Sequence, residues 1–276
     1  MQNAVALGTF DGLHKGHLSV LKIPDNYDKT ALIFRIPPKC VKSGVTELLL
    51  TPEEKIRKLE NMGFRVEALD FGEVERLSAA EFLEFVKYKF SPALISCGFN
   101  YRFGYGGKGD TLLLAEFCLK NKIELRLSSP VKDGEEIISS SRIRKLIKEG
   151  NITDANRLLG EDFSFTSPVI HGDGRGKTLG FPTVNQLYPE NLVPPKFGVY
   201  KTEAIINGKA YSSITDIGIR PTFPVDYIIS ETFIKNFEGD LYSKSLKITF
   251  KEFLRSEKKF SSVDELKIQI QKDIGE

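Results

Sequence analysis

The chain has 276 residues, which is long for one hydrophobic core and sufficient for two domains of ordinary size. Its 39 basic and 37 acidic side chains leave a net charge of +2, which excludes the one-sided surface of a nucleic-acid coat or a polybasic membrane anchor. No apolar run reaches the roughly 18 residues of a membrane span. The three cysteines share no CxxC spacing, so we expect no disulfide framework and a cytoplasmic protein.

The first half of the chain alternates between short apolar strands and helical patterns. We predict strands at residues 4–8, 30–34, 65–69, 93–97 and 123–127, and helices at 15–22, 52–62, 79–89, 110–121 and 141–149. This alternation predicts an α/β domain in which helices cover both faces of a parallel sheet. Sheets of this kind bind ligands at the carboxyl ends of their strands, where the functional residues should lie.

The second half follows a period of two residues. A helix at 154–159, ended by Gly160, is followed by strands at 199–206, 210–216, 227–234 and 246–250 and by a helix at 262–273. Several short strands with one terminal helix predict an antiparallel barrel or sandwich. We place the domain boundary near 160–164, so that residues 1–160 form the first domain and residues 163–276 the second.

A glycine-containing turn follows the first predicted strand. Gly8 lets the backbone approach a phosphate closely, and the next helix offers free N–H groups to an anion. His14 and His17 stand three residues apart on either side of Gly16, so both imidazoles share one helix face and can hydrogen-bond phosphate oxygens. A zinc pair is the alternative, but neither cysteine nor a further histidine stands near them in the sequence.

Two other segments of the first half carry candidate residues. Ser140 and Ser141 precede Arg144 in the first turn of a helix, where a cation opposes the helix dipole unless it meets a phosphate. Asn100 and Phe103 belong to an aromatic loop at the end of another strand, which suits the stacking of a flat ring. The G-x-G-x-x-G pattern at 104–109 does not directly follow a strand, so it indicates a flap over a nucleotide rather than NAD binding.

Together these segments resemble the nucleotidyltransferase module of bacterial bifunctional riboflavin kinase/FAD synthetases. That family carries Phe-Asp-Gly-x-His-x-Gly-His, Gly-x-Asn/Asp-Phe-x-Phe-Gly and Ser-Ser-Thr-x-x-Arg elements, spaced as in this chain. The resemblance implies a Rossmann-like domain in which the FMN phosphate attacks the α-phosphorus of ATP. It implies ATP binding by Gly8, Phe10, Gly16, Ser140 and Ser141, flavin binding by Asn100 and Phe103, and catalysis by His14, His17 and Arg144.

The densest motif of the second half runs from Gly172 to Asn185. Only three residues separate Gly172 from the Gly176-Lys177 pair, where a P-loop needs four, and no helix follows. The backbone and cations of this loop can still hold ATP phosphates, and Thr183 and Asn185 offer oxygen ligands to Mg²⁺. The predicted phosphate-binding residues are Gly172, Gly174, Arg175, Lys177 and Thr183.

Glu231 lies in a strand pattern at 229–234. By alternation it points to the same side as Ile229 and Phe233, which we predict to be the apolar side. A carboxylate among apolar neighbours is costly unless it is partnered or neutralised, and such burial is one way in which a general base is tuned. The alternative is an edge-strand glutamate in solvent.

Residues 172–185 and 229–234 resemble the riboflavin kinase module of the same family, as do the segments 196–200, 217–223, 240–242 and 254–260. The resemblance implies a six-stranded barrel in which Thr183 and Asn185 bind Mg·ATP and Glu231 deprotonates the ribityl 5′-hydroxyl. It also implies that Arg255 and the terminal helix close over the flavin. The expected activity is FAD synthesis from riboflavin and ATP by way of FMN, with no nucleic-acid or membrane partner.

Three positions depart from the family's pattern. Ser141 stands where the family has Thr, Pro37 where it has His, and Asp216 where it has Asn. The missing histidine leaves open a monofunctional riboflavin kinase with a degenerate N-terminal domain. A non-enzymatic flavin sensor is the other alternative, although binding alone does not require a base such as Glu231.

Overall fold

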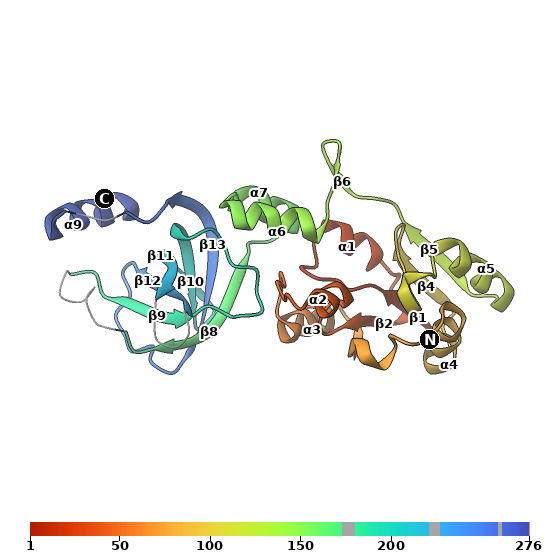
Figure 1. The fold of residues 1–276 in the computed structure, drawn as a ribbon. Helices are drawn as coiled ribbons and strands as arrows, with labels where there is room; N and C mark the ends of the chain where they lie inside the picture. Colours follow the sequence, from red (N-terminus) through yellow and green to blue (C-terminus); the bar gives the residue numbers. More distant parts are fainter. Residues whose placement is uncertain (173–179, 221–226, 259–260, 276) are drawn as a thin grey trace. The chain divides into compact units, whose positions relative to one another are not determined.

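The computed structural model describes residues 1–172, 180–220, 227–258 and 261–275. By its internal contacts the chain divides into two compact units, Met1–Ser140 and Ser141–Glu276 (Figure 1).

The first unit contains an open parallel sheet. Its strands are β1 (Gln2–Leu7), β2 (Tyr27–Phe34), β3 (Arg65–Leu69), β4 (Leu94–Gly98) and β5 (Glu124–Ser128). They lie in the order β3-β2-β1-β4-β5, so β1 is central and pairs in parallel with both β2 and β4. The chain builds outward from β1 in one direction and then resumes at β4 on its other side. This reversal between β1 and β4 is the point at which such sheets bind ligands.

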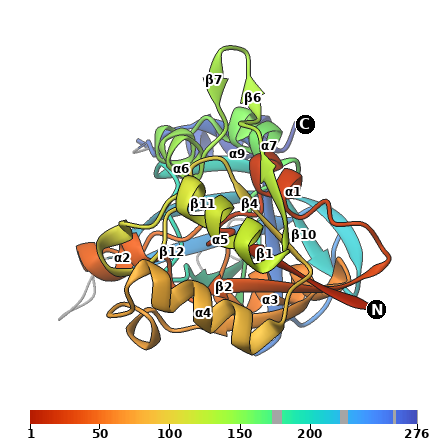
Figure 2. The same cartoon turned by 90° about the vertical axis from the view of Figure 1, so that its right-hand side faces the viewer.

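Helices cover both faces of this sheet, as the alternating pattern predicts. They are α1 (Lys15–Val20), α2 (Pro38–Ser43), α3 (Pro52–Asn61), α4 (Ala79–Phe90) and α5 (Thr111–Asn121). Successive β1 residues enter opposite cores: Ala4 and Ala6 pack with residues of α1 and α3, whereas Val5 and Leu7 pack with residues of α4 and α5. The short helix α2 and the β6–β7 hairpin (Lys132–Asp133 and Glu136–Ile137), which projects from the unit in Figure 2, were not predicted.

The second unit contains a closed six-stranded barrel in the order β10-β11-β12-β9-β8-β13. The strands are β8 (Ser164–Ile170), β9 (Thr183–Leu187), β10 (Gly198–Ile206), β11 (Lys209–Arg220), β12 (Tyr227–Ile234) and β13 (Ser245–Arg255). The helices are α6 (Ser140–Glu149), α7 (Ile152–Leu159) and α9 (Val263–Ile274). Both the barrel and its terminal helix are confirmed. Sequence alternation missed β8, which contains Pro168, and β9, which overlaps the glycine-rich motif.

Hydroxyl groups fill part of the barrel interior. Thr202 hydrogen-bonds Ser213 and Thr215 at 2.8 Å, and Thr215 reaches Thr232 at 2.9 Å. Ser230 extends this buried network to Thr232 at 3.3 Å. Because side chains alternate along a strand, the residues between these positions point to the outward face of the barrel.

Candidate active sites

The loop after β1 is held in an uncommon conformation. Phe10 and Leu13 both have positive φ angles, of 48° and 44°, which non-glycine residues rarely adopt. The ring of Phe10 is buried and packs against Gly8, where an added Cβ would lie 2.8 Å from the ring. A glycine at position 8 is therefore required by this packing, and backbone strain of this kind clusters at functional sites.

The two histidines of this loop stack on each other. The ring centroids of His14 and His17 are 3.7 Å apart, with an angle of 19° between the ring planes. Gly16 makes this possible, since an added Cβ would lie 3.1 Å from the His14 ring. Burial, the neighbouring His14 and the cation of Lys55 together hold the pKa of His17 well below its usual value. In this state His17 offers hydrogen bonding rather than a positive charge to a ligand.

The start of α6 reaches the same loop. The Ser140 hydroxyl donates a hydrogen bond to the backbone carbonyl of Asp11 at 3.0 Å. The Asp11 carboxylate in turn accepts a hydrogen bond from the Leu49 N–H at 2.9 Å, so both ends of this residue are held. The predicted residues Ser141 and Arg144 belong to the second unit and stay predictions.

The loop after β4 buries the ring of one predicted flavin-binding residue. Phe103 is only 5% exposed and packs in the core against Tyr101 and Phe82, with centroid separations of 5.7 and 5.6 Å. Its ring cannot stack on a flavin without leaving that core. Phe99, 41% exposed, presents its ring outward from the same loop, and Asn100 is exposed beside it. The sequence shows that this loop is aromatic, but it does not predict which of its rings are buried.

The glycines at 104–109 form a turn that packs on the protein. Gly104 lies so close to the backbone of Ala79 that an added Cβ would be 2.6 Å away, and the N–H of Tyr105 donates to the Leu77 carbonyl at 2.6 Å. This glycine has a positive φ of 71°. Close packing and turn geometry account for the pattern without a dinucleotide.

In the barrel, three predicted residues lie on one face of two neighbouring strands. The register of β12 and β9 places Glu231 opposite Asn185 and Phe233 opposite Thr183. Side chains directly opposite each other in an antiparallel pair share a face. The structure therefore brings together the proposed base and the two proposed magnesium ligands, which are 46 or more positions apart in sequence.

Glu231 shares its face with Ile229 and Phe233, as alternation predicts, but this face is not the barrel interior. The interior side of β12 carries the buried Ser230 and Thr232, and Glu231 is half-buried on the outward face. A cavity of about 190 Å³ opens on this face beside Phe233, with Asp273 and Ile274 of α9 in its wall. The apolar side that alternation predicts for Glu231 therefore faces outward on this strand, while hydroxyl groups occupy the interior side.

Asn185 is packed against the start of the glycine-rich loop. Its amide group lies directly over Gly172, where the structure leaves no room for a Cβ. Asn185 is 6% exposed, and its Oδ1 accepts no hydrogen bond from the residues that the structure describes. The predicted phosphate-binding residues Gly174, Arg175 and Lys177 lie outside the described residues.

Asp216, which the sequence marks only as a departure from the family's pattern, lies beside the predicted base. The register of β11 and β12 places it directly opposite Glu231. Burial, with the carboxylates of Glu257 and Glu231 nearby, raises the pKa of Asp216 to about 6, while Arg255 opposes the shift. The Asn-to-Asp departure thus adds a second carboxylate next to the proposed base. It was the signal that could have identified this position.

Arg255, predicted to contact the flavin, bonds to the terminal helix. Its Nη2 and Nε donate to the Asp273 carboxylate at 2.7 and 2.9 Å. Asp273 also lines the cavity beside Phe233, so the ion pair fastens α9 at the edge of that cavity.

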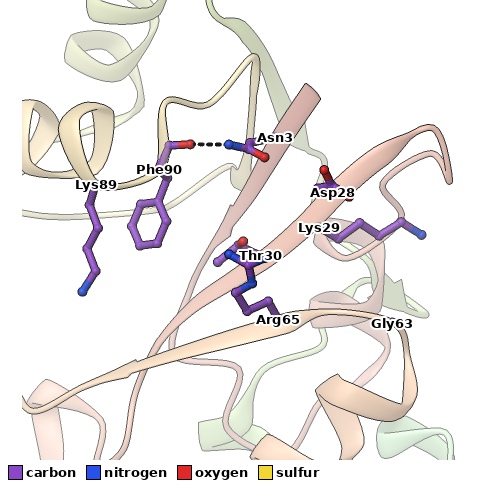
Figure 3. Close-up of a pocket in the computed structure, with 8 residues that line it drawn as sticks. All are labelled: Asn3, Asp28, Lys29, Thr30, Gly63, Arg65, Lys89 and Phe90. Carbon is purple, nitrogen blue, oxygen red and sulfur yellow. Dashed lines mark hydrogen bonds between the residues drawn. The ribbon is translucent and has the colours of Figure 1, made fainter. Parts of the chain in front are cut away.

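A second pocket, of about 260 Å³, lies in the first unit (Figure 3). It opens at the amino ends of the parallel strands, away from the loops at their carboxyl ends. The side chains of Lys29 and Lys89 point away from each other in Figure 3, and they pair with Asp25 and Glu67. None of the predicted site residues lines this pocket. Within the described ranges, no group of three or more His, Cys, Asp or Glu side chains could hold a metal ion.

Two family models match the chain, one described as FAD synthetase over residues 1–142 and one described as riboflavin kinase over residues 159–276. The chain is similar to the bifunctional riboflavin kinase/FMN adenylyltransferase of Listeria monocytogenes, with 32% identity over 99% of this chain and 90% of that protein. The Bacillus subtilis protein of the same name gives the same identity and coverage. That of Escherichia coli strain K12 is 30% identical over 98% of this chain and 90% of its own length.

A solved structure described as a macrolide-efflux protein from Streptococcus pneumoniae has a similar fold. The TM-score is 0.91 at 30% sequence identity, and the match covers 99% of this chain and 92% of that one. Among the helices that the structure describes here, none is both long enough and apolar enough to cross a membrane.

Proposed function

We propose that the chain, which belongs to the bifunctional riboflavin kinase/FMN adenylyltransferase family, makes FAD from riboflavin in two ATP-dependent steps. The barrel unit would phosphorylate riboflavin to FMN, and the parallel-sheet unit would adenylate the FMN. The observation that carries the proposal is the shared face of Thr183, Asn185 and Glu231, because a base beside oxygen ligands is what a kinase needs and a binding protein does not.

In the kinase step, Glu231 would take the proton of the riboflavin 5′-hydroxyl as that oxygen attacks the γ-phosphorus of ATP. The new oxygen–phosphorus bond forms while the bond to the bridging oxygen breaks, so that ADP leaves and FMN results. The cavity beside Phe233, fastened at its edge by Arg255 and Asp273, is where the flavin ring would lie.

The residues Thr183 and Asn185 fit a magnesium ion. Oδ1 of Asn185 is buried and accepts no hydrogen bond within the described part of the chain, and the Thr183 hydroxyl is on the same face. Hydroxyl and amide oxygens are among the hard ligands that Mg²⁺ accepts in nucleotide sites. A bound ion would supply neutralisation of the triphosphate charge.

In the adenylation step, a phosphate oxygen of FMN would attack the α-phosphorus of ATP, and pyrophosphate would leave. No nucleophile of the protein is needed, so binding, orientation and hydrogen bonding are the contributions of the site. His14 and His17 lie in the loop after β1, next to the switch point of the sheet, where they would contact the phosphates.

We also propose that the protein works in the cytoplasm. The structure leaves all three cysteines free. Burial raises the pKa of Cys97 to about 12 and that of Cys118 to about 11, so both thiols stay protonated and unreactive.

The purified protein incubated with riboflavin, ATP and Mg²⁺ should yield FAD, with FMN as the intermediate, on a chromatogram. Removing Mg²⁺ with a chelator should stop both steps. Formation of FMN alone would favour a monofunctional kinase, an outcome consistent with Pro37, which caps the start of α2 where the family has His. Absence of both products would refute the proposal and favour a flavin sensor.

The barrel unit should keep its kinase activity when it is expressed alone as residues 141–276. A shorter fragment, residues 162–276, lacks α7, whose Asn156 donates to the Phe250 carbonyl at 2.8 Å and accepts from the Phe163 N–H at 2.8 Å. We expect both fragments to form FMN but the shorter one to melt at a lower temperature, since it also loses the buried Leu158 and Leu159. If residues 141–276 fold by circular dichroism yet form no FMN, the assignment of the kinase to this unit is wrong.

A further inference from the structure

The most deeply buried lysine side chain among the described residues belongs to Lys55, on α3. It is 1% exposed, although lysine normally extends its ammonium group into water. A buried charge is unfavourable unless hydrogen bonds satisfy its donors. Nothing in the two-step reaction derived above uses this residue.

Backbone carbonyls satisfy the ammonium group. Its Nζ donates to the carbonyl of Phe34 at 2.6 Å, of Thr9 at 3.2 Å and of Arg35 at 3.3 Å. An ammonium group has three donors, so all of them are used. Thr9 follows the end of β1, and Phe34 is the last residue of β2. Lys55 therefore ties the loop that carries the two histidines to the carboxyl end of the neighbouring strand.

The charged groups around Lys55 come from several elements. Asp11 of the β1 loop and Cys40 of α2 favour its charged form, but burial outweighs them and lowers the pKa of Lys55 to about 8. The cation in turn contributes to the lowered pKa of His17 on α1. Near neutral pH a positive charge thus lies behind the loop at which a polyphosphate would bind.

We propose that Lys55 is a positioning residue for adenylyl transfer, which holds the Thr9 carbonyl and with it the loop of His14 and His17 in the geometry that binds the ATP phosphates. This inference rests on the proposed function of the first unit. Above about pH 8 the neutral amine has only two N–H donors for three carbonyls and no charge. One of the three hydrogen bonds from Lys55 to backbone carbonyls is then lost, and the site loses a positive charge that favours the binding of polyphosphate.

Three variants test this role: Lys55→Met, Lys55→Arg and, as a control, Lys120→Met, which changes an exposed lysine on α5 with no interaction described. Steady-state kinetics of FMN adenylation and of riboflavin phosphorylation would be measured from about pH 6.5 to 9.5. We expect Lys55→Met to lower kcat for adenylation by at least about tenfold, because small misplacements of catalytic groups are costly. Riboflavin phosphorylation, and both activities of Lys120→Met, should stay unchanged.

The pH profile separates positioning from simple stabilisation of the fold. Wild-type adenylation should decline above about pH 8, and Lys55→Arg should retain much of the activity and move this decline upward, because a guanidinium does not deprotonate there. A role in stability alone would lower the melting temperature and leave kcat and the profile of the folded enzyme unchanged. If Lys55→Met does not fold, the profiles of the wild type and Lys55→Arg decide the question.

Two results would overturn the inference: full adenylation by folded Lys55→Met, or an alkaline decline that Lys55→Arg does not move. Both leave the proposed function standing, since the enzyme still makes FAD. A wild-type protein that makes no FAD from FMN would instead refute the proposed function of the first unit, and the inference with it.

Discussion

Glu231→Gln should lower the rate of riboflavin phosphorylation by roughly a hundredfold or more, as expected when a general base is lost. The amide has nearly the shape of the carboxylate but cannot accept the proton of the 5′-hydroxyl. Asp216, opposite Glu231 in the register, is a second carboxylate that could accept part of this proton flux. In the double variant, Glu231→Gln with Asp216→Asn, the rate of riboflavin phosphorylation should therefore fall at least as far as in the single variant. The measurement is kcat for FMN formation under saturating ATP.

The same variant carries its own internal control. FMN supplied directly should still be adenylated at the wild-type rate, because Glu231 belongs to the other unit. Glu238→Gln makes the same chemical change at an exposed position of the second unit and should leave both activities intact. A folded Glu231→Gln enzyme with normal kinase activity would show that Glu231 is not the base. Loss of both steps at an unchanged melting temperature would contradict the model of two separate sites.

His17→Ala should give the opposite pattern, with normal FMN formation and adenylation weakened by about a hundredfold, the usual cost of removing one preorganised hydrogen-bond donor. The imidazole is held neutral by burial, by His14 and by Lys55, so its loss removes hydrogen bonding and a stacked ring rather than a fixed charge. The effect is measured as the rate at which FMN is converted to FAD, with the released pyrophosphate as the readout.

Melting temperature must be compared as well, because the variant leaves a gap beside the rings of His14 and Phe10. His171→Ala, which removes the third histidine from its stack on Tyr242 in the second unit, is the matched control and should adenylate FMN normally. Unchanged adenylation by His17→Ala would remove His17 from the site. Stoichiometric zinc in the purified protein would instead favour the metal-binding interpretation of the two histidines.

The sequence by itself determined the two architectures and most of their elements. Strand and helix periods differ enough that all five strands of the parallel sheet and four of the five helices that cover it could be read from the positions of apolar side chains. Motif spacing also grouped segments that the fold brings together: Ser140 bonds the loop before His14, and Thr183, Asn185 and Glu231 share a face. These are local patterns, which a sequence records directly.

Only the tertiary structure decided which strand faces and which side chains are buried by the rest of the protein. Alternation correctly assigned Glu231 to the side of Phe233, but the closure of the barrel made that side the outward one. The aromatic loop contained Phe103, yet packing against α4 placed its ring in the core. Lys55 stands among charged residues on a helix, and its burial depends on carbonyls 20 and more positions away. Periodicity reports which side chains share a face, whereas burial is set by partners distant in the sequence, and this is why the residues that surround the catalytic groups emerged from the fold alone.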